Sequence, residues 1–262
     1  MEEGKKIYFV SDAHLGLYPA QESLEREKLL VTWLKEIRED AAEIYLLGDI
    51  FDYWYEFRKV IPRGFTRFLG AVSEITDSGI PVHFFTGNHD VWVFDYLPKE
   101  TGVIVHREPL VKTWNGKKFY MAHGDGLGPG DKSYKLLKWA FTNKVLQWVF
   151  SRLHPNFSVG LGHAWSKNSR QQKGVYADFK GTDKEWLILH SGNLLEKEHY
   201  DFFIYGHRHI PMEISLGTKS RVVCLGDWIV NFTYAVFDGN ALKLLPYTKE
   251  DNIIRMDVPE IN

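Results

Sequence analysis

The chain has 262 residues, of which 44% are hydrophobic, so it can bury a sizeable core and is not expected to be disordered. Its formal net charge of −2 excludes a chain that is basic throughout, as a general nucleic-acid coat would be. A single cysteine excludes a disulfide framework, and the sequence shows neither a signal peptide nor an apolar run of about 18 residues, so we expect a cytoplasmic protein.

The chain opens on a strand followed by a helix. Residues 7–10 form a short apolar run typical of a buried strand, which ends at Asp12 and His14. Side chains two positions apart on an extended chain point to the same side, so both could reach one metal ion. Residues 21–39 then repeat apolar side chains at helical spacing. A helix cap beside a surface histidine is the alternative interpretation of this motif.

A second buried strand is expected at residues 44–47, parallel to the first because a helix connects the two. It stops at Gly48 and is followed by Asp49 and Asp52. Carboxylates at the carboxyl end of such a strand face the crevice in which open α/β sheets bind ligands. A simple helix cap explains this one motif equally well, so its meaning depends on the other strand ends.

The same pattern recurs at a third strand. Residues 63–78 have the period of a helix, and residues 82–85 form an apolar strand that runs into Gly87, Asn88 and His89. The glycine permits a tight turn, the asparagine offers a neutral oxygen ligand, and the histidine can exchange a proton near neutral pH. A third set of candidate ligands therefore follows a strand.

Two later strands end in histidines. A hairpin is predicted over residues 110–122 around an Asn-Gly turn, and His123 follows its second strand. Residues 201–205 form a fifth apolar strand, which ends at His207 and His209. Five strand ends with metal-ligand side chains are hard to explain as separate caps, so we expect one shared metal site.

The ligand types indicate the kind of metal. Seven side chains are candidates: Asp12, His14, Asp49, Asn88, His123, His207 and His209. Carboxylate, amide oxygen and imidazole without thiolate suit Mn, Fe, Zn or Co. Seven ligands are too many for one catalytic ion but suit two, which a bridging carboxylate would hold ~3.5–4 Å apart. Such a pair of ions assists in-line displacement at phosphorus, so the sequence predicts phosphoester chemistry.

Residues 127–175 interrupt the strand pattern. A long helical stretch, apolar around most of its circumference, is expected there, and residues 131–173 hold eight Lys or Arg against one acidic residue, a local charge of +7. This composition favours contact with something both apolar and anionic, although an ordinary surface helix with solvated lysines is the alternative. Because no linker divides the chain, we expect a single domain over residues 1–262 with a helical cap insertion at about 127–175.

The order of these motifs resembles the complete signature of the calcineurin-like metallophosphoesterases. The resemblance implies an α/β fold in which four αββα layers form a sandwich with two central sheets. It implies that one metal ion is held by Asp12, His14 and His209. It implies that the second ion is held by Asn88, His123 and His207, and that both are bridged by Asp49.

The resemblance also implies two catalytic residues that bind no metal. In the family, the histidine that corresponds to His89 faces the substrate, as an acid or as an oxyanion stabiliser. The carboxylate of Asp52 would then orient this imidazole and raise its basicity. The two carboxylates that follow the second strand would therefore have different tasks.

A narrower resemblance is to the UDP-2,3-diacylglucosamine diphosphatases of lipid A biosynthesis. It rests on residues 48–54, 123–125 and 168–170, together with the basic and aromatic insertion. That family hydrolyses the pyrophosphate at the α-phosphorus to UMP and 2,3-diacylglucosamine 1-phosphate, usually with Mn²⁺, at the cytoplasmic face of the inner membrane. The resemblance thus implies a lipid-linked nucleotide-sugar substrate and peripheral contact with that membrane surface. One position departs from it, since well-known members have Arg where this chain has His89.

The insertion also supplies candidates for substrate contacts, because its apolar helix could shelter acyl chains and its cations could meet phosphates. The candidates are Asn168, Ser169, Arg170 and Lys173, with a solvated loop as the alternative. Other functions on the same fold are a nucleotide-sugar pyrophosphatase, a phosphodiesterase, a phosphoprotein phosphatase, a nuclease or a non-catalytic scaffold. Intact ligands argue against a scaffold, and the acidic remainder of the chain argues against a nucleic-acid partner. No obligate protein partner is expected.

Overall fold

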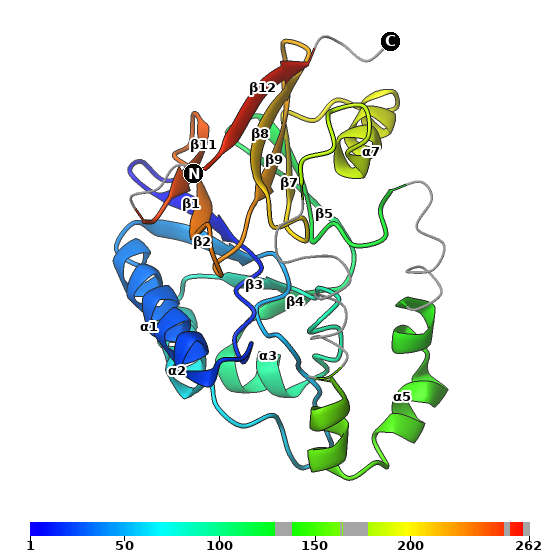
Figure 1. Ribbon diagram of the computed structural model, residues 1–262. Coiled ribbons are helices and arrows are strands. Elements are labelled where there is room, and N and C mark those ends of the chain that lie inside the picture. The colour runs from blue at the N-terminus through cyan, green and yellow to red at the C-terminus, as the bar shows by residue number, and fades with distance from the viewer. Residues whose placement is uncertain (129–137, 163, 165–177, 249–251, 259–262) are drawn as a thin grey trace.

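Two six-stranded sheets form the centre of the protein (Figure 1). The computed structural model describes residues 1–128, 138–162, 164, 178–248 and 252–258. The strand order is β11-β10-β1-β2-β3-β4 in the first sheet and β12-β8-β9-β7-β6-β5 in the second. Helices α1, α2 and α3 lie beside the first sheet, and α7 lies beside the second. The predicted four-layer α/β architecture is confirmed.

The first sheet is parallel at its centre. Its strands are β1 (Lys6–Val10), β2 (Ala41–Leu46), β3 (Val82–Phe85), β4 (Ile104–His106), β10 (Thr233–Phe237) and β11 (Leu242–Pro246). Strands β1 to β4 pair in parallel, whereas β10 pairs antiparallel with β1 and with β11. The carboxyl ends of β1, β2 and β3 therefore lie at the same edge of the sheet.

The second sheet mixes both directions. Its strands are β5 (Leu110–Trp114), β6 (Lys117–Ala122), β7 (Phe202–Tyr205), β8 (Pro211–Leu216), β9 (Ser220–Leu225) and β12 (Ile254–Val258). Strands β6, β7 and β9 pair in parallel, whereas β5 and β8 are antiparallel to β6 and β9. The ends of β6, β7 and β9 thus also share one edge.

The alternation of side chains along the strands explains the layers. Ile7 and Phe9 of β1 pack between the two sheets, whereas Tyr8 and Val10 pack against Trp33 and its neighbours on α1 (Ala20–Ile37). Burying such large side chains contributes about 1.5–3 kcal/mol each, so both faces of the strand hold the sandwich together. On the second sheet, residues of β7 pack in the same way between the sheets and against α7 (Trp186–Leu195).

Two short elements escaped the sequence patterns because distant residues stabilise them. The helix α3 (Tyr96–Thr101) has only six residues. The buried carboxylate of Glu56 accepts hydrogen bonds from the main-chain N–H groups of Phe94, Asp95, Tyr96 and Leu97, and so caps this helix from another loop. Strand β12 is likewise defined by its pairing with β8. By contrast, α2 (Thr66–Asp77) agrees with its predicted helix.

The predicted long helical stretch of the insertion is wrong within the residues that the structure describes. Helix α5 (Lys144–Phe150) begins after Asn143, which has ψ 118° and accepts hydrogen bonds from two N–H groups of the first turn. Asparagine favours such caps over helix interiors, so the helical segment breaks there. A further helical piece begins at Pro155, a residue suited to the first helical position. The single-domain organisation with an insertion stays a prediction.

None of the described helices combines the length and the apolar composition needed to cross a membrane.

Candidate metal centre

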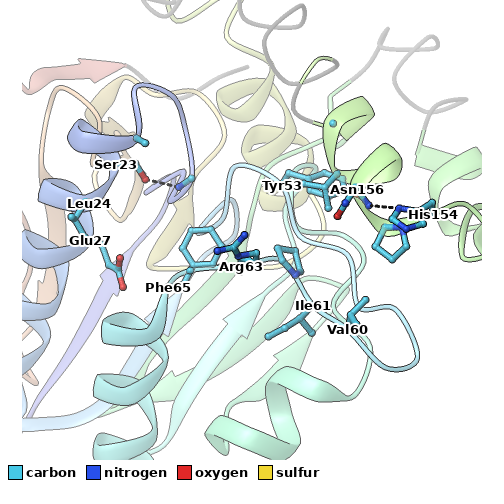
Figure 2. A pocket seen from close by; sticks show the side chains of 17 residues that line it. Ser23, Leu24, Glu27, Tyr53, Val60, Ile61, Arg63, Phe65, His154 and Asn156 are labelled. Carbon is cyan, nitrogen blue, oxygen red and sulfur yellow. Dashed lines mark hydrogen bonds between the residues drawn. The ribbon is translucent and has the colours of Figure 1, made fainter.

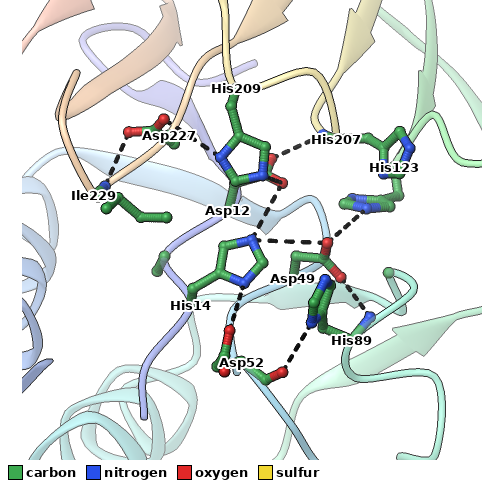
Figure 3. Close-up of polar contacts among 12 residues, drawn as sticks. Asp12, His14, Asp49, Asp52, His89, His123, His207, His209, Asp227 and Ile229 are labelled. Carbon is green, nitrogen blue, oxygen red and sulfur yellow. Dashed lines mark hydrogen bonds and ion pairs between the residues drawn. The ribbon is translucent and has the colours of Figure 1, made fainter. Parts of the chain in front are cut away.

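Six of the seven predicted ligands, all but Asn88, are seen together at one place (Figure 3). They follow β1 and β2 of the first sheet and β6 and β7 of the second, and Asn88 follows β3. In one group, ligand atoms of Asp12, His14 and His209 lie within 4.8 Å of one another, and the same holds for Asp49, His123 and His207. The first group contains the residues that the resemblance implied for one ion. The second contains His123 and His207 of the other set together with Asp49, and Asn88 directly precedes His89, whose main-chain N–H donates to Asp49.

The backbone around this site is unusual. Five of the seven predicted ligands have positive φ: Asp12 (54°), His14 (44°), Asp49 (51°), His207 (65°) and His209 (54°). Non-glycine residues adopt this region rarely, and such strain persists where the surrounding structure holds it. Clustering at one site is typical of functional strain rather than of ordinary turns.

Glycines allow the ligand loops to approach one another. A Cβ atom on Gly87 would lie 2.2 Å from Asp49 Oδ1, and one on Gly206 would lie 2.6 Å from Asp12 Oδ2. Real Cβ atoms do not come so close to other heavy atoms, so a side chain at either position would displace a ligand. The glycines in the predicted motifs therefore serve the geometry of neighbouring ligands.

The carboxylate of Asp49 lies between the two ligand groups. Its Oδ2 lies 3.3 Å from His123 Nε2 and 3.8 Å from His14 Nε2, and these two histidines belong to different ligand groups. Its Oδ1 accepts a hydrogen bond of 2.8 Å from the main-chain N–H of His89. One carboxylate oxygen is thus held in place while the other lies between the two groups.

Three of the histidine rings have an acceptor beside Nδ1, the ring nitrogen that faces away from the other ligands. His123 Nδ1 donates to the carbonyl of Leu47 at 2.8 Å, which leaves the Nε2 lone pair for a metal. His14 Nδ1 lies 3.2 Å from Asp52 Oδ1, and His209 Nδ1 lies 3.3 Å from Asp227 Oδ2. Metal-binding histidines commonly have such an acceptor behind the ring, because it fixes the tautomer and raises basicity.

The residues fit metal ions by a further observation. Among the described residues, Asp12 Oδ1, Asn88 Oδ1 and His123 Nε2 are buried atoms without a hydrogen-bond partner. Leaving one such group unsatisfied costs about 1–3 kcal/mol, so three in one site call for another partner. Carboxylate, amide oxygen and imidazole all supply lone pairs, which a divalent cation would accept. The family and these clusters indicate a dinuclear metal site.

The pKa shifts of His14 and Asp49 show how strongly the buried carboxylates and imidazoles of the site interact. Burial lowers the pKa of His14, but the carboxylates of Asp12, Asp52 and Asp49 outweigh it and raise the pKa to about 9. Burial also opposes ionisation of Asp49, yet His123 and His89 hold the pKa of this carboxyl well below its usual value. Protons therefore compensate the carboxylates when no cation does, and cations must compete with them.

Asp52 requires a correction. The sequence predicted that its carboxylate orients His89, but this carboxylate is directed to His14. The main-chain carbonyl of Asp52 accepts a hydrogen bond of 2.9 Å from His89 Nδ1 instead. Asp52 thus contacts His14 with its carboxylate and His89 with its main-chain carbonyl, because the chain after β2 directs these two groups toward different neighbours.

His89 is placed as a neutral base in the free protein. A carbonyl can only accept, so its Nδ1 must carry the hydrogen and its Nε2 the lone pair. Burial lowers the pKa of His89 to about 4, although the carboxylate of Asp49 opposes this shift. The ring lies edge-on to His14, with 4.7 Å between centroids. Ligand atoms of His89, His14 and Asp49 also lie within 4.8 Å of one another, so His89, with its fixed tautomer, adjoins both other ligand groups.

Two aspartates that support the site were not assigned a role from the sequence. Asp90 accepts hydrogen bonds from the N–H of Ile50 at 2.8 Å and of Gly87 at 2.7 Å, and so ties two ligand loops together. Asp227 holds His209 and is itself fixed by three main-chain N–H groups. A signal for Asp227 was present, since residues 225–227 repeat the Leu-Gly-Asp sequence of residues 47–49.

The helical segment 138–162 rests on the loops that follow the ligands. Trp92 Nε1 donates to the carbonyl of Phe141 at 2.9 Å, and the Tyr55 hydroxyl donates to the carbonyl of Gln147 at 2.8 Å. The loops that hold Asp49 and His89 thereby position the insertion. The predicted substrate contacts Asn168, Ser169, Arg170 and Lys173 lie outside the described residues.

A cavity of about 1030 Å³ opens between this segment, helix α1 and the loop of residues 60–65 (Figure 2). Gly16, two residues after His14, and Tyr53, next to Asp52, both line it. Its other walls are α1, the loop of residues 60–65 and residues 154–160, and their lining is mainly apolar. The cavity is therefore adjacent to the ligand loops.

Known proteins resemble this chain over most of its length. The sequence profile of the calcineurin-like phosphoesterases matches residues 5–211. A UDP-2,3-diacylglucosamine hydrolase of Porphyromonas gingivalis is 42% identical, covering 91% of this chain and 96% of that protein. A protein of the same name from Vibrio atlanticus is 29% identical, with the same coverage. The E. coli phosphoesterase Yfce aligns with a TM-score of 0.44 and 12% identity over 92% of each chain. The chain belongs to the calcineurin-like phosphoesterase family.

Proposed function

We propose that the protein hydrolyses UDP-2,3-diacylglucosamine at the α-phosphorus, giving UMP and 2,3-diacylglucosamine 1-phosphate. The observation that carries the phosphoester chemistry is Asp49 Oδ2 between two histidine-containing ligand groups. The choice of substrate follows the relatives, which are named for this lipid and match along nearly their whole length. A soluble nucleotide sugar is the alternative substrate.

The ligand sets assign the metal chemistry. One ion would be held by Asp12, His14 and His209, the other by Asn88, His123 and His207, and both by Asp49. We propose Mn²⁺ for both ions, as the resemblance to the diphosphatases implies, although the oxygen and imidazole ligands also suit Fe, Zn or Co. Two such ions would activate water and neutralise charge on phosphate oxygens. A soft-metal site is disfavoured, since the one cysteine is buried in the core as Cys224.

His89 would respond to the substrate. Its pKa of about 4 in the free protein keeps the imidazole uncharged at neutral pH. A pyrophosphate bound beside it would favour the protonated form, because an opposite charge raises the pKa of a base. Nε2 could then donate a proton or a hydrogen bond to the leaving phosphate, while Nδ1 stays bonded to the Asp52 carbonyl.

The apolar cavity supports the lipid part of the proposal. Leu24 and Phe65 on one side and Val159 on the other line it, so acyl chains would be screened from water. Figure 2 shows Ser23 and Glu27 of α1 across from His154 and Asn156, with the loop of Arg63 and Phe65 between. A water-soluble sugar nucleotide would gain less from the apolar part of these walls.

The experiment follows UMP release from UDP-2,3-diacylglucosamine in water labelled with heavy oxygen and Mn²⁺. Attack at the α-phosphorus places the label in UMP. Gly160→Leu should raise KM for the lipid and not for bis(4-nitrophenyl) phosphate, because a Cβ at Gly160 meets no atom and the new side chain would enter the cavity. Gly70→Leu, equally open but on α2 and not among the cavity-lining residues, is the control.

Label in the lipid phosphate would contradict the site of attack. Good turnover of a soluble nucleotide sugar without turnover of the lipid would contradict the substrate. Equal effects of Gly160→Leu on both substrates would show that the cavity does not hold the acyl chains.

We further propose that the helical segment 138–162 docks on an anionic bilayer at the cytoplasmic face of the inner membrane. Large apolar side chains on it are exposed by about half or more: Trp139, Val145, Trp148, Val149, Phe157 and Leu161. Cations accompany them, with the Arg152 guanidinium 4.8 Å from the Trp148 ring centroid. Tryptophan beside cations suits the boundary between acyl chains and anionic headgroups.

Vesicle binding tests this surface. The full-length protein should co-sediment with vesicles of phosphatidylglycerol and phosphatidylethanolamine, and Val145→Asp/Trp148→Asp should abolish binding while hydrolysis of bis(4-nitrophenyl) phosphate is kept. Val111→Asp is the matched control, since Val111 is also exposed, at 42%, but lies on β5. Equal loss in the control, or undiminished binding of the double variant, would contradict the proposal.

A further inference from the structure

A buried ion pair stands directly behind two of the candidate ligands. Arg208 lies between His207 and His209 in the loop after β7, and only 6% of its surface is exposed. The two histidines belong to different ligand groups, so this loop serves both halves of the centre. The side chain between them contacts the outer helical layer, through the segment that leads into α7.

The guanidinium of Arg208 is held by several neighbours. Its Nε donates to Glu185 Oε2 at 2.9 Å and its Nη2 to Glu185 Oε1 at 2.7 Å, which makes the pair bidentate. Glu185 is fully buried, and its Oε1 also accepts from the N–H of Lys180. The guanidinium lies 4.7 Å from the ring of Trp186, whose edge approaches His207. A planar fork between a carboxylate and an indole has little freedom to move.

The loop needs such support because its backbone is strained. His207 and His209 both have positive φ, at 65° and 54°. Strained residues keep such conformations when neighbouring groups fix them. On one side, Asp12 Oδ2 accepts from the N–H of His207 and Asn231 donates to the carbonyl of His209. On the other side, Arg208 supplies the restraint.

We propose that Glu185 and Arg208 are positioning residues for the metal centre. Their bidentate pair holds the loop in the conformation that presents both histidines to the two ions. Neither side chain touches a ligand atom or a substrate in this role. The inference rests on the metal centre and is independent of the lipid, so its test uses metal ions alone.

Titration of the metal-free protein with Mn²⁺ by calorimetry tests the proposal. Glu185→Gln leaves one amide in place of the carboxylate and should weaken Mn²⁺ binding ~10–100-fold, the usual effect of changing groups behind the ligands. Glu43→Gln is the matched control, since it breaks the ion pair of Glu43 with Lys112 away from the centre. It should lower the melting temperature and leave the affinity for Mn²⁺ unchanged.

A double variant separates positioning from stability. In Arg208→Met/Glu185→Leu, apolar side chains replace the whole pair, a change that often preserves or improves stability. If the pair positions the loop, this variant folds with a near-native melting temperature and still binds Mn²⁺ ~10–100-fold more weakly. Native affinity in the folded double variant, or equal affinity losses in Glu185→Gln and Glu43→Gln, would overturn the proposal. Arg208→Lys, which keeps the charge but not the fork, should fall between the wild type and Glu185→Gln.

Discussion

Asp49→Asn is expected to abolish hydrolysis and to leave the centre unable to hold two ions. The amide can still accept the N–H of His89 through its oxygen, but it then turns an NH2 group toward His123 and His14. An N–H donor at this position would repel cations, and both ions would lose the negative charge of the carboxylate that they share. The loss of affinity should exceed the 10–100-fold that is usual for groups behind the ligands.

Metal content after dialysis against Mn²⁺, measured by mass spectrometry, checks this expectation together with UMP release. Asp77→Asn, at an exposed position near the end of α2, removes the same charge away from the centre and should change neither quantity. Two tightly bound ions in Asp49→Asn would contradict the bridging role, whatever the remaining activity.

His89→Gln is expected to lower kcat about 10²–10⁴-fold, the range for loss of a general acid or base. Two ions should remain bound, because the contact of residue 89 with Asp49 is made by the main-chain N–H, which the substitution preserves. The effect should be of the same order for the lipid substrate and for a 4-nitrophenyl ester, because a leaving phosphate monoester, with a second pKa of about 6, needs a proton no more than 4-nitrophenolate does.

Kinetics on both substrates, with metal content measured in parallel, separate the possible roles. His199→Gln replaces an exposed histidine outside the centre and serves as the control. A loss of rate on both substrates with two ions still bound would support a role of His89 toward the substrate, and full activity on both would contradict it. Loss of metal in His89→Gln to the extent expected for Asp49→Asn would instead identify His89 as a ligand.

Local patterns were sufficient for most of the fold and for the gathering of the ligands. A strand needs only a short apolar run, and parallel strands must present their carboxyl ends at one edge. Asp12 and Asp49 could therefore be placed together without coordinates, whereas His123 follows a strand of the second sheet and only its type marked it as a ligand. The close contacts of Gly87 and Gly206 with ligand oxygens show why those motifs require glycine.

The groups that hold the ligand side chains in place could not be predicted from local sequence patterns. The carboxylate of Asp52 contacts His14, and its carbonyl contacts His89, a division set by the direction of one turn. Asp227 holds His209 from the end of β9; the repeated Leu-Gly-Asp sequence marks this aspartate but does not identify its partner. The end of the predicted long helix at Asn143 likewise depended on whether a local cap would prevail over helical period.

The residues after β2 show which properties follow from the sequence and which from the tertiary structure. The sequence by itself determined that Asp49 follows a buried strand and meets other potential ligands, because strand period and parallel pairing are local properties of the chain. Only the tertiary structure decided that Asp49 Oδ2 lies between His14 and His123, and that Glu185 and Arg208 support the opposite loop. Such contacts join residues tens of positions apart, and their geometry follows from the packing of two sheets and their helices.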